Sequence, residues 1–243
     1  MTGSSCTIIG AGLVGSLAAI AMNNLGVKTK IIDKGSPKDS FTKDTRALVL
    51  SYSSINLLSA LDLWAEIEKS SVPIKEIRIT DAGSFGTVLL KASDVGASAL
   101  GWSCNAGLLL SRLHDAIQSA PLVESLWRTK FKRLVSNRGE VEIEAETDHQ
   151  SIRLESDILI GADGTWSEIR EALALPVETI DYDQSAIVSI VKAEFDYGET
   201  AFERFTEHGS MALIPTNSGD FVSVQCLATK QAVTTLNLSD KKF

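Results

Sequence analysis

The chain has 243 residues, of which 44% are hydrophobic and 22% are charged, as in an ordinary globular protein with one large domain or two modest ones. Its 23 basic and 31 acidic residues give a formal net charge of −8, and no basic cluster interrupts the sequence. We therefore exclude nucleic acid as the main partner, because binding to nucleic acid depends on clustered positive charge.

The first predicted element is a short apolar strand that runs directly into three glycines. Gly10, Gly12 and Gly15 fit the pattern G-x-G-x-x-G, and residues at helical spacing follow them. In such a turn the first glycine permits a tight bend, the second lets backbone amides approach a diphosphate, and the third lets helix and strand pack closely. The following helix offers unpaired N–H groups to the phosphates, beginning at Leu13. These four residues predict a dinucleotide site.

Residues 28–33 are predicted to form a second strand, which ends at Asp33. Asp33 follows the first glycine at close to the spacing of about 20 residues expected for a carboxylate that binds a ribose hydroxyl. This carboxylate would repel a 2′-phosphate, so it favours FAD or NAD over NADP. The apolar start of the chain is not interpreted as a signal peptide or a membrane span, because glycines and polar residues interrupt it and no basic residue precedes it.

The elements that follow alternate between helical and β patterns. Helices are predicted over residues 46–64 and 108–117, and a β-hairpin is predicted between them over residues 74–92. Further strands are predicted around residues 141–146 and 152–154, and the chain after residue 176 is rich in β patterns at 185–195, 210–215 and 221–227. We therefore predict an α/β protein in which a Rossmann-like domain, residues 1–71 and 102–178, is interrupted by a β-rich substrate domain, residues 72–101 and 179–243.

A second motif follows a short apolar strand predicted over residues 157–160. The strand delivers Asp163 and Gly164 at its carboxyl end, where ligands bind in open α/β sheets. Ser167 stands where it would cap the next helix. From these residues alone, two interpretations stay open: a ligand-binding turn, or an ordinary Asp-Gly surface turn in front of a capped helix.

Together, the two motifs resemble those of the FAD-dependent aromatic hydroxylases, a family of flavoprotein monooxygenases. The resemblance implies that Gly10, Gly12, Gly15 and Asp33 bind the ADP part of FAD. It further implies that the run Gly-Ala-Asp-Gly, ending in a serine and an arginine, lies near the diphosphate of the flavin and is linked to the use of NAD(P)H. The residues concerned are Asp163, Gly164, Ser167 and Arg170. Arg46 matches an arginine that the family has near the cofactor.

The β-rich part is similar to the branch of this family that works in ubiquinone biosynthesis. The resemblance lies mainly in the run from Ala201 to Gly209 and in Ala212–Pro215. Two positions depart from the branch, Ser210 after the glycine and Leu108 in the helix near the cofactor. The third motif of the family, a Gly-Asp segment followed by His-Pro and Gly-Gln-Gly, is absent, so we expect the C-terminal part of the family fold to be missing.

The resemblance implies an enzyme that uses FAD, NAD(P)H and O₂ to hydroxylate a polyprenylated phenol. Two alternatives stay open: an inactive nucleotide-binding fragment, and a different flavoprotein oxidoreductase of the same fold. No catalytic residue is assigned, because His114, His149 and His208 are scattered and fit ordinary core or surface positions.

The expected surroundings of the protein follow from its cysteines and from the resemblance. The three cysteines are far apart and have no metal-ligand spacing, which favours a reducing cytoplasm and no metal site. The ubiquinone branch implies that the protein is cytoplasmic or peripheral to the inner membrane, or joins a biosynthetic complex. A homodimer is also expected, because an incomplete fold exposes apolar surface and a sheet edge.

Overall fold

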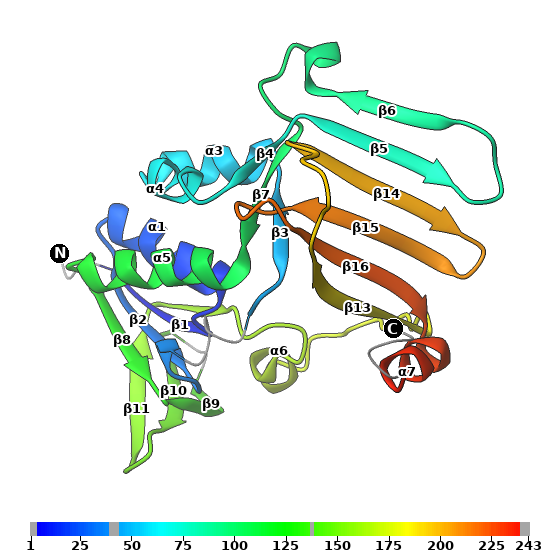
Figure 1. Cartoon of the computed structure of the whole chain (residues 1–243). Coiled ribbons are helices and arrows are strands. Elements are labelled where there is room, and N and C mark those ends of the chain that lie inside the picture. Colours follow the sequence, from blue (N-terminus) through cyan, green and yellow to red (C-terminus); the bar gives the residue numbers. More distant parts are fainter. Residues whose placement is uncertain (1–3, 39–43, 137–138, 239–243) are drawn as a thin grey trace. The chain divides into compact units, whose positions relative to one another are not determined.

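The computed structural model describes residues 4–38, 44–136 and 139–238 (Figure 1). The chain divides into two compact units, each built from two separate segments. Unit 1 comprises residues 1–45 and 106–177, and unit 2 comprises residues 46–105 and 178–243. The chain thus passes from unit 1 to unit 2, returns to unit 1, and ends in unit 2.

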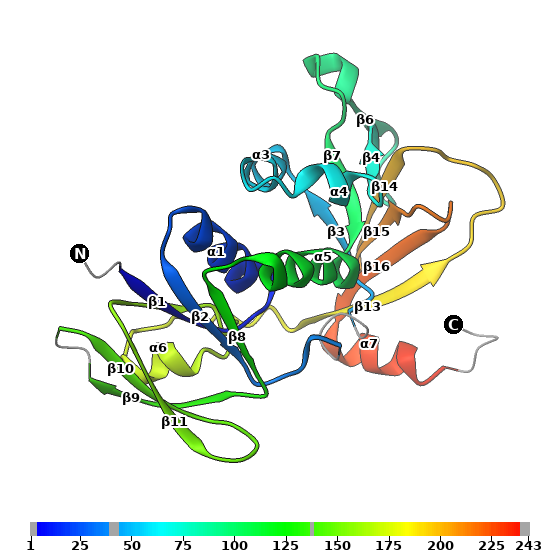
Figure 2. The same ribbon diagram turned by 90° about the vertical axis from the view of Figure 1, so that its left-hand side faces the viewer.

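Unit 1 is built on a parallel sheet of four strands in the order β12-β1-β2-β8. These strands are β1 (Ser5–Ile9), β2 (Lys28–Asp33), β8 (Val123–Trp127) and β12 (Ile158–Gly161). Two helices, α1 (Leu13–Asn24) and α5 (Ala106–Ser119), lie side by side over this sheet (Figures 1 and 2). The predicted strands at residues 28–33 and 157–160 are confirmed.

A three-stranded antiparallel sheet packs against the parallel one. Its strands are β9 (Lys130–Ser136), β10 (Val141–Glu146) and β11 (Ser151–Ser156), in the order β11-β10-β9. The hydrophobic cluster that joins the two sheets contains seven buried residues: Ile9, Ile32, Phe131, Ile143, Ala145, Leu154 and Ile169. The glutamates that alternate with Ile143 and Ala145 instead form ion pairs with exposed basic residues on the neighbouring strands. This alternation explains why β10 has one buried face and one wet face.

Unit 2 contains a six-stranded sheet in the order β13-β16-β15-β14-β5-β6 and a three-stranded sheet in the order β3-β7-β4. The strands of the larger sheet are β5 (Glu76–Asp81), β6 (Thr87–Lys91), β13 (Gln184–Val191), β14 (Thr200–Thr206), β15 (Gly209–Pro215) and β16 (Phe221–Ala228). The smaller sheet comprises β3 (Ala47–Leu50), β4 (Val72–Ile74) and β7 (Gly101–Asn105). The α-helices are α3 (Tyr52–Ala60), α4 (Trp64–Glu68) and α7 (Thr229–Leu236), and Ala92–Val95 forms a 3₁₀ turn, η1. The predicted α/β class, with a parallel nucleotide sheet and a separate β-rich part, is confirmed.

The structure differs from the sequence prediction over residues 46–64. Residues 47–50 form β3 instead of the start of a helix, and the helical part is split into α3 and α4. β3 pairs with β7, which also pairs with β4, so this segment joins unit 2 and not unit 1. The boundary between the units therefore falls near residues 45 and 105, whereas the sequence suggested residues 71 and 102.

A carboxylate in the larger sheet gives unit 2 a testable dependence on pH. Glu203 lies on β14 between Ile79 of β5 and Ala212 of β15. Burial among these neighbours raises the pKa of Glu203, and a hydrogen bond from Ser210 partly offsets the rise. Because the folded protein then binds more protons than the unfolded chain, this carboxylate makes the fold less stable as the pH rises above the pKa of an ordinary glutamate.

We predict that Glu203→Gln raises the midpoint of thermal unfolding near neutral pH by about 1 to 2 °C, because the amide keeps the size of the side chain and carries no charge. The difference should disappear below about pH 4, where the carboxyl group of the parent is protonated in both states. Glu178, which is exposed, provides the matched control. A Glu203→Gln midpoint below that of the parent at neutral pH would contradict this prediction.

Within the described part of the chain, no helix has both the length and the apolar composition needed to cross a lipid bilayer.

Candidate functional site

The glycine-rich turn between β1 and α1 depends on close contact between backbone segments. Gly10 has a φ of +99°, and a Cβ atom on it would lie 2.4 Å from the carbonyl oxygen of Ala162. A Cβ atom on Gly15 would lie 1.8 Å from the carbonyl oxygen of Gly10. Both distances are far below van der Waals contact, so neither position accepts a larger residue without movement of the backbone. The structural roles expected for the first and third glycines are therefore present.

At Gly12, neither the backbone conformation nor contact with the rest of the protein requires a glycine. Its φ of −70° and ψ of −172° are open to any residue, and a Cβ atom there would have no neighbour within 4 Å. Gly12 is the N-cap of α1, which begins at Leu13, and neither a side-chain cap nor an acidic residue occupies the first turn. The start of this helix at Gly12 is therefore open and has no capping side chain, as binding of a diphosphate to the helix N-terminus requires.

Asp33, at the end of β2, is tied to the same turn. Its Oδ2 accepts a hydrogen bond from the backbone N–H of Ala11 at 2.8 Å, and its Oδ1 accepts one from the N–H of Gly35 at 2.7 Å. A carboxylate oxygen has more than one acceptor position, so both oxygens can also accept hydrogen bonds from ribose hydroxyls. The carboxylate is thus oriented by backbone amides beside the expected position of the ribose.

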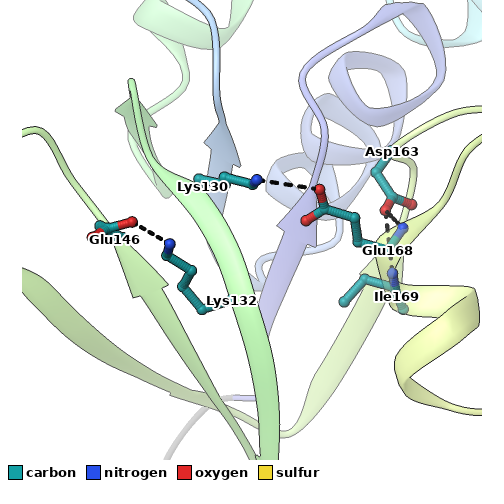
Figure 3. A network of polar contacts seen from close by, with 6 residues as sticks. All are labelled: Lys130, Lys132, Glu146, Asp163, Glu168 and Ile169. Atoms are coloured by element: carbon teal, nitrogen blue, oxygen red, sulfur yellow. Dashed lines mark hydrogen bonds and ion pairs between the residues drawn. The ribbon is translucent and has the colours of Figure 1, made fainter.

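The second motif forms the turn between β12 and the short helix α6 (Glu168–Ala172). Oδ2 of Asp163 accepts hydrogen bonds from the backbone N–H groups of Glu168 at 2.7 Å and of Ile169 at 3.3 Å (Figure 3). The hydroxyl of Ser167 accepts the N–H of Arg170 at 3.0 Å, and the Arg170 guanidinium donates to the carbonyl of Thr165 at 2.7 Å. The predicted cap at Ser167 is confirmed, and the motif stabilises its own turn.

One pocket joins the two motifs. Gly10 and Asp33 of the first motif line it together with Asp163 of the second. The remaining residues of the pocket are Ile9, Ile32, Lys34, Thr129, Lys130, Phe131, Trp166 and Glu168. A neighbouring groove is lined by Asp163, Gly164, Ser167 and Arg170 among others. Folding therefore brings together residues that are separated by about 130 positions in the sequence.

The charges and polar atoms at the pocket fit a dinucleotide. The other oxygen of Asp163, Oδ1, is buried and has no partner among the described residues, so it is free to accept a hydrogen bond. Lys130 Nζ lies 3.7 Å from Glu168 Oε1, and Lys132 forms a second ion pair with Glu146 nearby (Figure 3). Lysines and carboxylates are thus mixed at the pocket, whereas the first turn of α1 holds no acidic residue and offers a positive dipole end to phosphates.

Several residues of the pocket carry no strong signal in the sequence. Trp166, which is 86% exposed, lies inside the second motif, and Lys34 directly follows Asp33. Both could have been predicted as pocket residues from their positions next to motif residues. Lys130 and Phe131 begin β9 and Thr129 directly precedes it, and no motif marks this segment. Arg46 belongs to unit 2, where it is exposed and directly precedes β3, and its role beside the cofactor stays a prediction.

Comparisons with known proteins agree with this geometry. The family model described as FAD binding domain matches residues 4–240. Ubiquinone hydroxylase UbiL of Rhodospirillum rubrum is 29% identical over 210 residues, in an alignment that covers 86% of this chain and 48% of UbiL. The 3-demethoxyubiquinol 3-hydroxylase of Escherichia coli is 24% identical over 212 residues, covering 86% of this chain and 53% of that enzyme. The chain spans about half the length of the curated relatives it matches.

The fold is also that of a solved monooxygenase. The crystal structure of p-nitrophenol 4-monooxygenase PnpA from Pseudomonas putida superposes with a TM-score of 0.82 at 14% identity, covering 99% of this chain and 60% of PnpA. The match to the family model extends over nearly the whole chain and includes both motifs. The resemblance seen in the sequence and the prediction of FAD as cofactor are confirmed. The chain therefore belongs to the family defined by the FAD-binding domain.

Proposed function

We propose that the protein to which this chain belongs is an FAD-dependent monooxygenase that hydroxylates a polyprenylated phenol in ubiquinone biosynthesis. The net reaction converts the phenol, NAD(P)H, a proton and O₂ into the hydroxylated phenol, NAD(P)⁺ and water. FAD would accept the electrons of NAD(P)H and deliver them to O₂. Gly12, Leu13 and Asp33 would bind and orient the ADP part of FAD, and Asp163 would lie beside them.

The observation that carries this proposal is that both motifs meet at one pocket in a chain whose relatives include ubiquinone hydroxylases. Gly10, Asp33 and Asp163 line the same pocket although they come from distant parts of the sequence. UbiL of Rhodospirillum rubrum and the Escherichia coli hydroxylase align over most of this chain. The run from Phe202 to Thr206 also resembles that of the 2-octaprenyl-6-methoxyphenol hydroxylases, and this resemblance favours hydroxylation over reduction of a prenyl chain.

An aromatic groove in unit 2 supports an apolar substrate. The ring of Tyr197 lies 5.4 Å from that of Phe202 and 6.1 Å from that of Phe221, with edge-to-face geometry. These rings line the groove together with Val191, Lys192, Ala193, Glu194, Phe195 and Leu213. Aromatic and aliphatic side chains with few polar groups suit the ring or the prenyl tail of such a phenol.

The resemblance to the ubiquinone branch and the pattern of cysteines support our proposal about location. We propose that the protein acts in the cytoplasm, at the periphery of the inner membrane or within a biosynthetic complex. A homodimer is proposed on a separate ground, namely that an incomplete fold would expose apolar surface and a sheet edge.

The test is to purify the chain, add FAD, and remove the excess by gel filtration. We expect the protein to retain FAD with its visible absorption, to oxidise NADH or NADPH, and to add one hydroxyl to a prenylated phenol, as read by mass spectrometry. Retention of FAD without oxidation of NAD(P)H would favour the fragment alternative. Reduction of the prenyl chain without hydroxylation would favour another flavoprotein, and failure to bind FAD would overturn the assignment of the site.

A further inference from the structure

The peptide group that joins Ala11 to Gly12 is fixed by two side chains buried beneath the turn. The carbonyl oxygen of Ala11 lies 2.9 Å from Nε2 of His114 and 3.1 Å from the hydroxyl of Ser16, which donates to it. A carbonyl oxygen can only accept a hydrogen bond, so Nε2 of His114 must carry the proton and donate. His114 is 2% exposed and Ser16 is fully buried, so bulk water does not compete with either donor for the carbonyl oxygen of Ala11.

The position of His114 is itself fixed by the strands beneath it. His114 lies on α5, and its ring packs against Trp127 with a centroid distance of 4.8 Å and an interplanar angle of 60°. Trp127 ends β8 and is paired in register with Asp33 at the end of β2. Asp33 in turn accepts the N–H of Ala11. His114 and Asp33 therefore orient the two peptide groups on either side of the Ala11 Cα atom.

The direction of the Gly12 amide follows from this arrangement. In a trans peptide the C=O and the N–H point in opposite directions, and the C=O of Ala11 shares its peptide plane with the N–H of Gly12. Because His114 and Ser16 draw the carbonyl inward, the Gly12 N–H must point outward. Gly12 is exposed and faces the open space at the start of α1. This is the space that the diphosphate of FAD would occupy.

We propose that His114 is a positioning residue for the cofactor: by donating to the carbonyl of Ala11, it aims the amide of Gly12 at the diphosphate of FAD. This inference rests on the placement of FAD in the proposed function. It assigns a role to a histidine that neither motif contains. The same peptide could not rotate to turn its N–H inward without leaving two buried donors unpaired, which costs free energy.

The test compares two substitutions that separate the hydrogen bond from the packing. His114→Phe keeps an aromatic ring against Trp127 and removes the donor, whereas His114→Gln keeps an N–H group near the position of Nε2 and loses the ring. We expect His114→Phe to weaken the binding of FAD and of ADP by about tenfold, and His114→Gln to stay within about threefold of the parent. Titration calorimetry measures both ligands, and the unfolding midpoint of each apoprotein reports its fold.

A role in core packing alone predicts the reverse order, with His114→Phe binding like the parent and His114→Gln as the weaker variant, and that result would overturn the proposal. If His114→Phe does not fold, Ser16→Ala removes the other donor to the same carbonyl and should weaken binding by about threefold. Unchanged binding in Ser16→Ala together with lost binding in a folded His114→Gln would also overturn it. If the parent itself binds neither FAD nor ADP, the placement of the cofactor fails instead.

Discussion

Gly12→Val will abolish the binding of FAD and leave the apoprotein folded. A Cβ atom at this position meets no protein atom within 4 Å, so we expect the valine side chain to be accommodated without unfolding the turn. It would instead project into the space in front of the N–H groups of α1, which the diphosphate must enter. We expect the dissociation constant for FAD to rise by at least about 100-fold, because several charge-assisted hydrogen bonds would be lost together.

The measurement is a titration of the apoprotein with FAD, followed by fluorescence of the flavin. Thermal unfolding of the ligand-free variant provides the control, and its midpoint should lie within a few degrees of the parent's. Binding of FAD to folded Gly12→Val with the affinity of the parent would contradict the placement of the diphosphate at this turn.

Gly15→Ala is expected to have the opposite signature, a loss of stability of the whole fold. The added Cβ atom would lie 1.8 Å from the carbonyl oxygen of Gly10, which is backbone and cannot rotate away as a side chain would. Relief of this overlap requires α1 to move away from β1, and Ala19 and Ile20 on the buried face of α1 would lose contacts with it. We expect a loss of about 3 kcal/mol or more in the free energy of unfolding.

Urea denaturation of the apoproteins measures this loss. Gly12→Ala provides a matched control, since it adds the same methyl group three residues earlier in the same turn but into open space. A Gly15→Ala protein that is as stable as Gly12→Ala would show that α1 and the turn can separate at little cost, contrary to the packing described above.

The first motif could be recognised from the sequence because its signals are local. The strand before Gly10, the helix after it and the strand that ends at Asp33 each show a short-range pattern of apolar residues that predicts the element. The glycines mark steric requirements that no other residue meets at positions 10 and 15. The strand at residues 141–146 was likewise readable from its alternating glutamates.

The segment 47–50 could not be assigned correctly for the opposite reason. Ala-Leu-Val-Leu is a short apolar run that suits either a strand or the first turn of a helix. Its conformation is decided by pairing with β7, whose residues Gly101–Asn105 lie more than 50 positions away. Trp102 of β7 then packs edge-on against both Tyr52 and Trp64, and this contact ties α3 and α4 to the same unit. Only the assembled sheet supplies these partners.

The sequence by itself determined the glycine-rich turn, the acidic residue at the end of the second strand, and the resemblance to FAD-dependent hydroxylases, because each depends on residues close together in the chain. Tertiary structure alone decided which distant residues share a site. It brought Asp163 and Lys130 to the pocket of Gly10 and Asp33, and it placed His114 beneath Ala11. These contacts arise from the packing of strands and helices, and the identity of a partner across such packing is not encoded by spacing along the chain.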